Sequence, residues 1–237
     1  MSLYLLHIKS YFFATFIVIA CCVSVNAQDE AIMNYLRHTG DYAEIYNGEV
    51  ESVYNVLQYS SFPYYMSPDF TNASIVYKNN SYPNQKVRLD LFKEQLILVL
   101  PEKQFAIIVN SKDVDSVHMY NRTFVRLDPP KKSGLRQGFY IQLMDSEKIQ
   151  VYRKDHFNID RRKQKYTFEL KTQYYLLYED RYYTVKNKNS FSKIFTQHKK
   201  QIDKFAKENK LNFEQYKDES LISLAAYCEE LITSTNK

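Results

Sequence analysis

The stretch KVRLDLFKEQLILVL, residues 86–100, predicts two β-strands joined by a tight turn. Polar and apolar side chains alternate from Lys86 to Phe92, which is typical of a strand with one buried face. Lys93-Glu94 then leads into Gln95–Leu100, which is apolar on both faces and therefore belongs near the centre of a sheet or beneath helices. We expect the two segments to be neighbouring strands of a larger sheet.

Similar segments continue on both sides of this stretch, separated by short polar turns. Connections of only about 2–5 residues allow antiparallel neighbours but no parallel crossovers. We therefore predict an α+β fold built on an antiparallel meander of about ten strands, forming a curled sheet, a half-barrel or a sandwich. The predicted strands are 74–78, 86–92, 95–100, 105–109, 114–120, 123–127, 138–144, 148–154, 165–171, 173–178 and 181–186.

The hydrophobic period changes after residue 186, and two or three amphipathic helices are predicted over about 190–234. Ser190 and Asp218 are the expected N-caps. Cys228 lies within an apolar stripe at helical spacing, which predicts a buried thiol. Because the helices need an apolar partner, we expect them to cover the exposed side of the sheet within a single domain, 28–237.

Residues 1–27 are typical of a secretory signal peptide, with Lys9 ahead of an apolar run and a cleavage site after Ala27. Two alternatives stay open, a lipoprotein lipidated at Cys21 and an uncleaved anchor. The expected location is therefore the periplasm or the periphery of the outer membrane, with no transmembrane span in the mature chain.

Charge is distributed unevenly along the chain. Residues 28–100 carry a net charge of −4 and residues 101–237 a net charge of +8, which with Lys9 gives the total of +5. One basic run comprises Arg161, Arg162 and Lys163. Such a run suits an anionic lipid surface, an acidic glycan or an acidic partner protein, although a merely solvated surface is the alternative. Nucleic acid is not expected, because the exported chain contains no nucleic-acid-binding motif.

The motifs of common catalytic and cofactor sites are absent: GxxxxGK[ST], GxGxxG, GxSxG and HExxH do not occur. We therefore predict no cofactor, no metal site and no catalytic residue. The acidic residues Asp41, Glu44, Glu49 and Glu51 leave two readings open. They belong either to an uncommon hydrolase with paired carboxylates or to a solvated sheet edge.

The chain has 22 tyrosines and no tryptophan, and several tyrosines come in adjacent pairs. Neighbours in a strand face opposite sides of the sheet, so one ring of each pair should pack inward and the other should face outward. Outward rings are suitable for contacts with sugar, lipid or protein, and the alternative is that tyrosine simply favours strands. The candidate surface contacts are Tyr65, Tyr175 and Tyr183.

Ser116 is a candidate modification site. Asp115-Ser116-Val117 resembles the Asp-Ser/Thr-aliphatic acceptor that some Gram-negative lineages O-glycosylate during export.

From Tyr46-Asn47-Gly48 to the C-terminus, the layout resembles a group of exported envelope proteins of Gram-negative bacteria that has no assigned activity. The residues that carry this resemblance are 87–92, 95–98, 182–186, Ser190, 194–195, 199–200 and 211–213. At the level of architecture, the meander is also similar to half-barrel lipoprotein carriers. We therefore expect a non-enzymatic protein that binds a partner protein, a glycan or a membrane surface. A carrier of an acyl chain or lipoprotein is the main alternative, and a hydrolase of envelope polymers is the second. The oligomeric state is left open.

Overall fold

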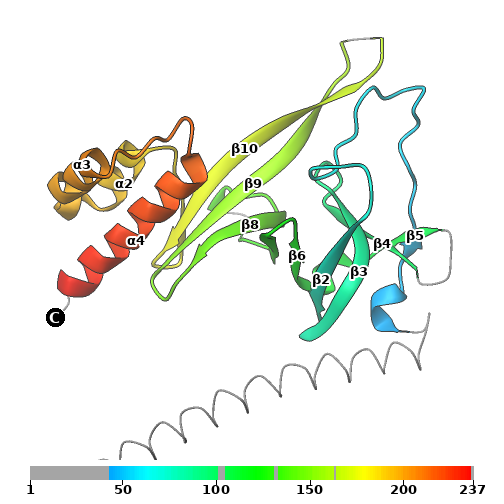
Figure 1. Cartoon of the computed structure of the whole chain (residues 1–237), viewed down its shortest axis with the longest axis horizontal. Coiled ribbons are helices and arrows are strands. Elements are labelled where there is room, and N and C mark those ends of the chain that lie inside the picture. The colour runs from blue at the N-terminus through cyan, green and yellow to red at the C-terminus, as the bar shows by residue number, and fades with distance from the viewer. Residues whose placement is uncertain (1–42, 101–104, 131–132, 163, 236–237) are drawn as a thin grey trace, which may run out of the picture.

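A computed structural model describes residues 43–100, 105–130, 133–162 and 164–235 (Figure 1). The described strands are β1 (Glu49–Val50), β2 (Thr71–Tyr77), β3 (Asn80–Asp90), β4 (Gln95–Val99), β5 (Ala106–Ile108), β6 (Val114–Met119), β7 (Arg122–Leu127), β8 (Gly138–Asp145), β9 (Ile149–Asp160), β10 (Thr167–Tyr178) and β11 (Arg181–Thr184). The helices are η2 (Glu44–Tyr46), η3 (Ser111–Asp113), α2 (Lys188–Ile194), η5 (Thr196–His198), α3 (Lys199–Glu208) and α4 (Lys217–Thr235).

The strands form one antiparallel sheet of 11 strands in the order β1-β5-β4-β3-β2-β6-β7-β8-β9-β10-β11. The sheet is open, with β1 and β11 at its edges, and three α-helices follow it. The predicted class, an α+β fold with a curled antiparallel meander and C-terminal helices, is therefore confirmed. The hairpin predicted from residues 86–100 is β3–β4, in which Val87 pairs with Leu98 and Asp90 with Gln95.

The curl of the sheet is visible in strand β3. β3 pairs with β2 from Asn80 to Val87 and with β4 from Val87 to Asp90, and Asn84, which has a φ of 56°, lies at a register shift in the pairing with β2. A straight strand of this length would span roughly 36 Å. Yet the short connection through η3 reaches both ends of β3: Ser111 Oγ lies 3.5 Å from the carbonyl of Glu94, and Lys78 N donates to Asp113 O at 2.9 Å. β3 must therefore arch, which brings β6 beside β2.

Two predicted strands, 165–171 and 173–178, are one continuous strand, β10. It pairs with β9 from Thr167↔Asp160 to Tyr178↔Ile149. Its partner β9 also continues to Asp160, beyond the end predicted at Lys154, and Phe157 and Ile159 extend the apolar alternation over this part. Thr172 continues the strand because its hydroxyl donates to Asp155 Oδ1 at 2.6 Å.

Buried apolar side chains form three clusters. The sheet core fills the inside of the curl and consists of Ala43, Ile45, Tyr46, Ala73, Ile75, Tyr77, Tyr82, Val87, Leu89, Leu91, Leu96, Leu98, Leu100, Ile107, Val109, Val114, Val117, Met119, Phe124, Phe139 and Ile141. The helix core consists of Ile149, Val151, Tyr174, Leu176, Val185, Phe191, Phe195, Ile202, Leu221, Leu224, Ala225 and Cys228. The tyrosine cluster consists of Tyr140, Tyr152 and Tyr175.

The three α-helices confirm the helical region predicted at about 190–234, but they cover one end of the sheet rather than its whole exposed side (Figure 1). The cap of α2 is Asn187, whose side chain accepts from Asn189 N, and not Ser190. Asp218 lies inside α4 and is buried at 7% exposure against the sheet. Cys228 is buried as predicted, and burial raises the pKa of its thiol to about 12.

Candidate functional site

The tyrosines predicted as surface contacts lie mostly inside the protein. Tyr175 is only 7% exposed, so its assignment as a surface contact is wrong. Both faces of the sheet are covered at this position, because Tyr174 belongs to the helix core and Tyr175 to the tyrosine cluster. Tyr65 is half-buried with its ring 4.7 Å from that of Phe124, and Tyr183 is half-buried against the helix core.

The other predicted residues are in different parts of the molecule. Ser116 is a half-buried residue in the middle of β6, where it pairs with Val76 and Val125. Arg161 and Arg162 are both exposed and follow the end of β9. The structure does not bring the predicted tyrosines and arginines together into one site.

Some predictions fall outside the described residues. These are the signal peptide 1–27, the lipidation candidate Cys21, the basic residue Lys163 and the acidic residue Asp41.

The acidic residues near the start of the chain have separate roles. Glu44 pairs with Lys78 on the surface at 3.2 Å, and Glu49 is exposed in the edge strand β1. Glu51 accepts two hydrogen bonds of 2.7 Å from the Arg88 guanidinium and is largely buried. Within the described ranges, no group of three or more His, Cys, Asp or Glu side chains is placed to hold a metal ion.

A turn at residues 55–59 lies against the tip of the β9–β10 hairpin. The backbone N–H groups of Gln58 and Tyr59 donate to the carbonyl of Asn55, at 2.9 and 3.0 Å, and close the turn. Tyr166 N donates to Gln58 O at 2.9 Å, and Ser60 N donates to Tyr166 O at 3.0 Å. These bonds fix the turn to the hairpin although the two segments are far apart in sequence.

Apolar and basic side chains project from this junction. Val56 is 64% exposed and Leu57 is 76% exposed, at the outermost part of the turn. The Lys165 ammonium donates to the carbonyl of Val56 at 3.1 Å, and the Arg161 guanidinium lies 5.7 Å from the centre of the Tyr166 ring. We call the following residues the tip surface: Val56, Leu57, Arg161, Arg162, Lys165 and Tyr166.

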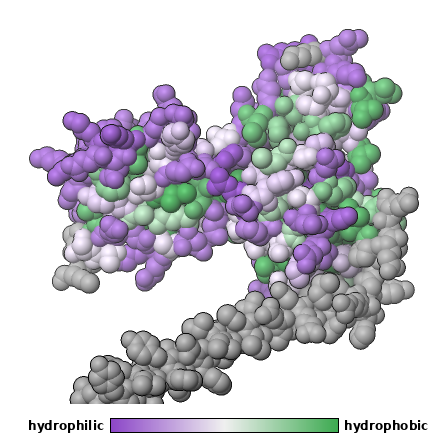
Figure 2. Space-filling model, in the orientation of Figure 1, coloured by the Kyte–Doolittle hydropathy of each residue, from purple (hydrophilic) through white to green (hydrophobic). Residues whose placement is uncertain are grey.

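Figure 2 shows the same arrangement from outside, with hydrophilic residues at the crest of the hairpin and hydrophobic residues on the loop beside it. Arg162 is held by Asp160 at 2.8 Å, yet its side chain remains 83% exposed. Exposed aliphatic groups beside cations are what a protein needs to contact a surface that is apolar and anionic at once.

Aromatic packing supports the turn from beneath. The Tyr54 ring makes edge contacts with Tyr59 and Phe168, with ring centres 5.2 and 5.3 Å apart, and Tyr59 stacks on Phe168 at 5.4 Å. The Tyr54 hydroxyl donates to Asp90 Oδ2 at 2.7 Å. Burial raises the pKa of both groups, and the hydrogen bond to the Asp90 carboxylate adds to the shift at Tyr54.

A second polar group anchors the start of the same loop. The Arg88 guanidinium lies between the rings of Tyr64 and Phe70, 4.3 and 4.4 Å from their centres, and pairs with Glu51. The Tyr64 hydroxyl donates to Glu51 at 3.2 Å, and burial raises its pKa. Both oxygens of Glu51 accept from Arg88 Nη2, and Arg88 Nη1 donates to the carbonyl of Pro68 at 2.8 Å, so this arginine of β3 holds both the start and the end of the loop on the sheet.

Sequence reasoning identified the arginines of the tip surface but missed Val56 and Leu57. Residues 51–61 show neither helical nor strand periodicity, so no role was assigned to them. A usable signal was present: Val53, Val56 and Leu57 are aliphatic residues in a segment with no predicted element to bury them.

Comparison with known proteins adds no assignment, because no family model, curated protein or solved structure matches the chain. No helix among the described residues is sufficiently long and apolar to cross a lipid bilayer.

Proposed function

We propose that the protein is a non-enzymatic component of the cell envelope that binds an anionic membrane surface through the tip surface. One observation carries this proposal: Val56 and Leu57 are exposed on a turn that is fastened to a hairpin tip bearing Arg161, Arg162 and Lys165. The resemblance to exported envelope proteins agrees with it.

The expected energetics fit reversible attachment. Insertion of a leucine side chain into the interfacial region contributes about 2 kcal/mol. Each cation close to an anionic membrane contributes about 1 kcal/mol. Arg162 contributes less, because Asp160 pairs with it at 2.8 Å. Two aliphatic side chains and the cations Arg161 and Lys165 therefore give appreciable binding, and the electrostatic part should weaken as salt is added.

Rigid support favours the same function. The Val56–Leu57 turn is held by backbone hydrogen bonds to the hairpin and by the aromatic packing around Tyr54. A preorganised surface loses little conformational freedom on binding, so more of the contact free energy appears as affinity.

The carrier alternative receives less support. An acyl-chain carrier needs unfilled apolar space, and the inside of the curl is occupied by large side chains such as Tyr77, Tyr82, Phe124 and Phe139, all at most 3% exposed.

Co-sedimentation with lipid vesicles tests the proposal. The protein should sediment with vesicles that contain phosphatidylglycerol and remain in solution with vesicles of phosphatidylcholine alone. Leu57→Asp removes the apolar contact and adds a repelled charge, so it should weaken binding roughly thirtyfold or more. Arg161→Gln should weaken it about fivefold.

Matched control variants come from the far end of the molecule. Tyr216 is 57% exposed and lies just before α4, and Lys200 is exposed on α3 (Figure 1). Tyr216→Ala and Lys200→Gln should leave vesicle binding unchanged. Equal losses in the tip and control variants, or equal binding to both kinds of vesicle, would contradict the proposal.

A further inference from the structure

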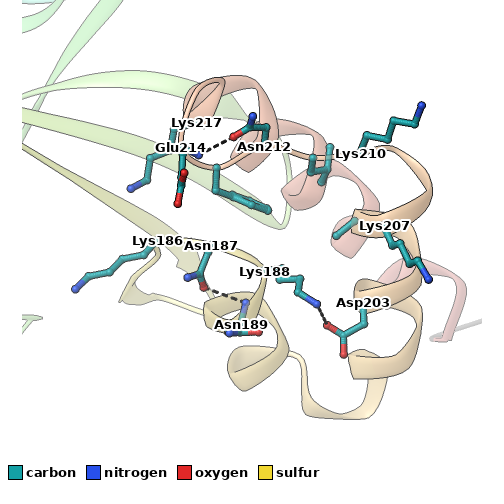
Figure 3. A pocket seen from close by; sticks show the side chains of 13 residues that line it. Lys186, Asn187, Lys188, Asn189, Asp203, Lys207, Lys210, Asn212, Glu214 and Lys217 are labelled. Atoms are coloured by element: carbon teal, nitrogen blue, oxygen red, sulfur yellow. Dashed lines mark hydrogen bonds and ion pairs between the residues drawn. The ribbon is translucent and has the colours of Figure 1, made fainter.

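An open pocket lies in the helical part of the molecule, far from the tip surface (Figures 1 and 3). Its cavity volume is about 1020 Å³, which would hold a short oligosaccharide or peptide. Its walls come from the link between β11 and α2, from α2 and α3, from the α3–α4 connection and from the first residue of α4. No strand among the described residues lines it.

The pocket is strongly cationic, with five lysines and two acidic residues in its lining. The Lys188 ammonium is neutralised by Asp203 at 3.0 Å. Within the described ranges, no ion pair engages the amines of Lys186, Lys207 or Lys210. A concave surface with unpaired charges of one sign attracts ligands of the opposite sign.

Figure 3 shows how these amines are distributed. Lys207 and Lys210 extend on one side of the pocket, and Lys186 and Lys217 extend on the other. Lys217 also lies over the ring of Tyr174, with its ammonium 5.1 Å from the ring centre. A ligand with several separated negative charges would therefore find a cation near each of its ends.

The backbone at Lys210 is unusual for a lysine. Lys210 has a φ of 50°, and the bonds Leu211 N→Ala206 O and Lys210 N→Lys207 O form the Schellman arrangement that ends α3. Glycine is the residue that this position favours. The lysine side chain is therefore not required for the turn, which makes it available for binding.

The remaining lining residues suit a polar ligand that has flat apolar faces. Asn187 and Asn212 use their carbonyl oxygens to accept from nearby backbone N–H groups. This leaves the amide N–H groups of Asn187 as donors, whereas the amide of Asn212 also donates to Gln215 Oε1 at 3.5 Å and keeps one N–H group. Asn189 adds a third amide, and the half-buried Phe213 ring supplies an apolar wall. Sugars present hydroxyl groups and apolar ring faces together, and aromatic rings and amides match these.

We propose that this pocket binds an acidic oligosaccharide, in which carboxylate groups of uronic acid units contact the lysines. Each lysine ammonium is a point charge on a flexible stem, so the separated amines can reach different carboxylates of one ligand. A peptide is less suited, because the lining has no strand edge to which an extended chain could add. This site is independent of the proposed membrane contact.

Isothermal titration with oligogalacturonate, in the absence of vesicles, tests this assignment. The protein should bind the oligosaccharide, and added salt should weaken the binding. Lys210→Gly should weaken it roughly fivefold. Because glycine is favoured at this position, urea unfolding should show that the variant is at least as stable as the parent protein.

Lys204→Gln is the matched control, since Lys204 is an exposed lysine of α3 outside the pocket lining, 3.8 Å from Glu208. It should bind oligogalacturonate as the parent protein does. Leu57→Asp should also retain this binding, which separates the inference from the membrane proposal. Three results would overturn it: no binding of oligogalacturonate, equal losses for Lys204→Gln and Lys210→Gly, or equally tight binding of an oligoglutamate peptide.

Discussion

The curled half of the sheet and the helical end of the molecule bury their apolar side chains in different ways. In the curl, strands β2–β8 contribute to the sheet core, and the side chains of β2 and of most of β3 alternate between the inside and the solvent. At the other end, α2, α3 and α4 pack together against the ends of β8–β11. The difference shows that one continuous sheet can serve two cores when its strands extend beyond the first of them.

The two cores are linked by both apolar and polar contacts. Leu143 of β8 packs against the sheet core and against the helix core. Asp218 of α4, which also accepts from Tyr174 of the helix core, pairs with Arg122 of β7 at 3.3 Å and with Arg153 of β9 at 3.1 Å. We therefore expect the two halves to unfold together although their architectures differ.

Removal of one large side chain from each core tests this coupling with the largest expected effect. Phe124 is 1% exposed in the sheet core and Phe191 is 0% exposed in the helix core. Phe124→Ala and Phe191→Ala should each lower the free energy of unfolding by about 3–5 kcal/mol. Urea unfolding followed by circular dichroism at helix- and strand-sensitive wavelengths should give a single transition in each variant. Separate transitions would show that the halves are independent.

Loss of the polar link between the halves should lower the free energy of unfolding nearly as much. Asp218→Ala leaves the partly buried Arg153 guanidinium without one of its two carboxylates and the Tyr174 hydroxyl without its acceptor. We expect urea unfolding to give a free energy of unfolding that is lower by about 3 kcal/mol. Glu219→Ala, at the exposed neighbouring position, is the control and should change stability little. An equal effect for both variants would mean that the buried network is unimportant.

We expect the contribution to stability of Asp90, which accepts from Tyr54 beneath the turn at residues 55–59, to depend on pH. Burial raises the folded-state pKa of Asp90 above its ordinary value of 3.8. The folded protein then binds the proton more tightly than the unfolded chain, so this carboxyl group's contribution to stability is present below pH 3.8 and is lost as pH rises through the folded pKa. Asp90→Asn cannot ionise, so its stability relative to the parent should increase from pH 4 towards neutrality. A constant difference across this range would contradict the shift.

The smallest change in stability is expected from substitutions in two hairpin turns, one in each half of the molecule. Asn121 after β6 and Asp180 after β10 have φ values of 55° and 56°, at turn positions that favour glycine. Asn121→Gly and Asp180→Gly should each stabilise the protein by about 1 kcal/mol or less. Equal shifts in one common unfolding transition would support coupling of the halves, whereas a shift confined to one half would weaken it.

Much of the fold could be predicted from the sequence, because alternation at residues 86–92 and the helical stripe around Cys228 report directly on buried faces. The continuity of β10 could not, since Lys171, Thr172 and Gln173 are three polar residues in succession that interrupt the alternation between Leu170 and Tyr174. Tyr175 was misplaced for a related reason: alternation reveals which side a ring faces but not whether that side is covered. Leu57 was missed for another reason, because it lies in a segment with neither helical nor strand periodicity.

Hydrogen–deuterium exchange on phosphatidylglycerol vesicles tests the central claim most directly. Bound protein should show slower exchange at residues 55–60 and 164–167, which lie together at the tip, with no change in α2, α3 or α4. Slower exchange in the helices instead, or none at the tip despite sedimentation with the vesicles, would contradict the assignment of the tip surface as the membrane contact.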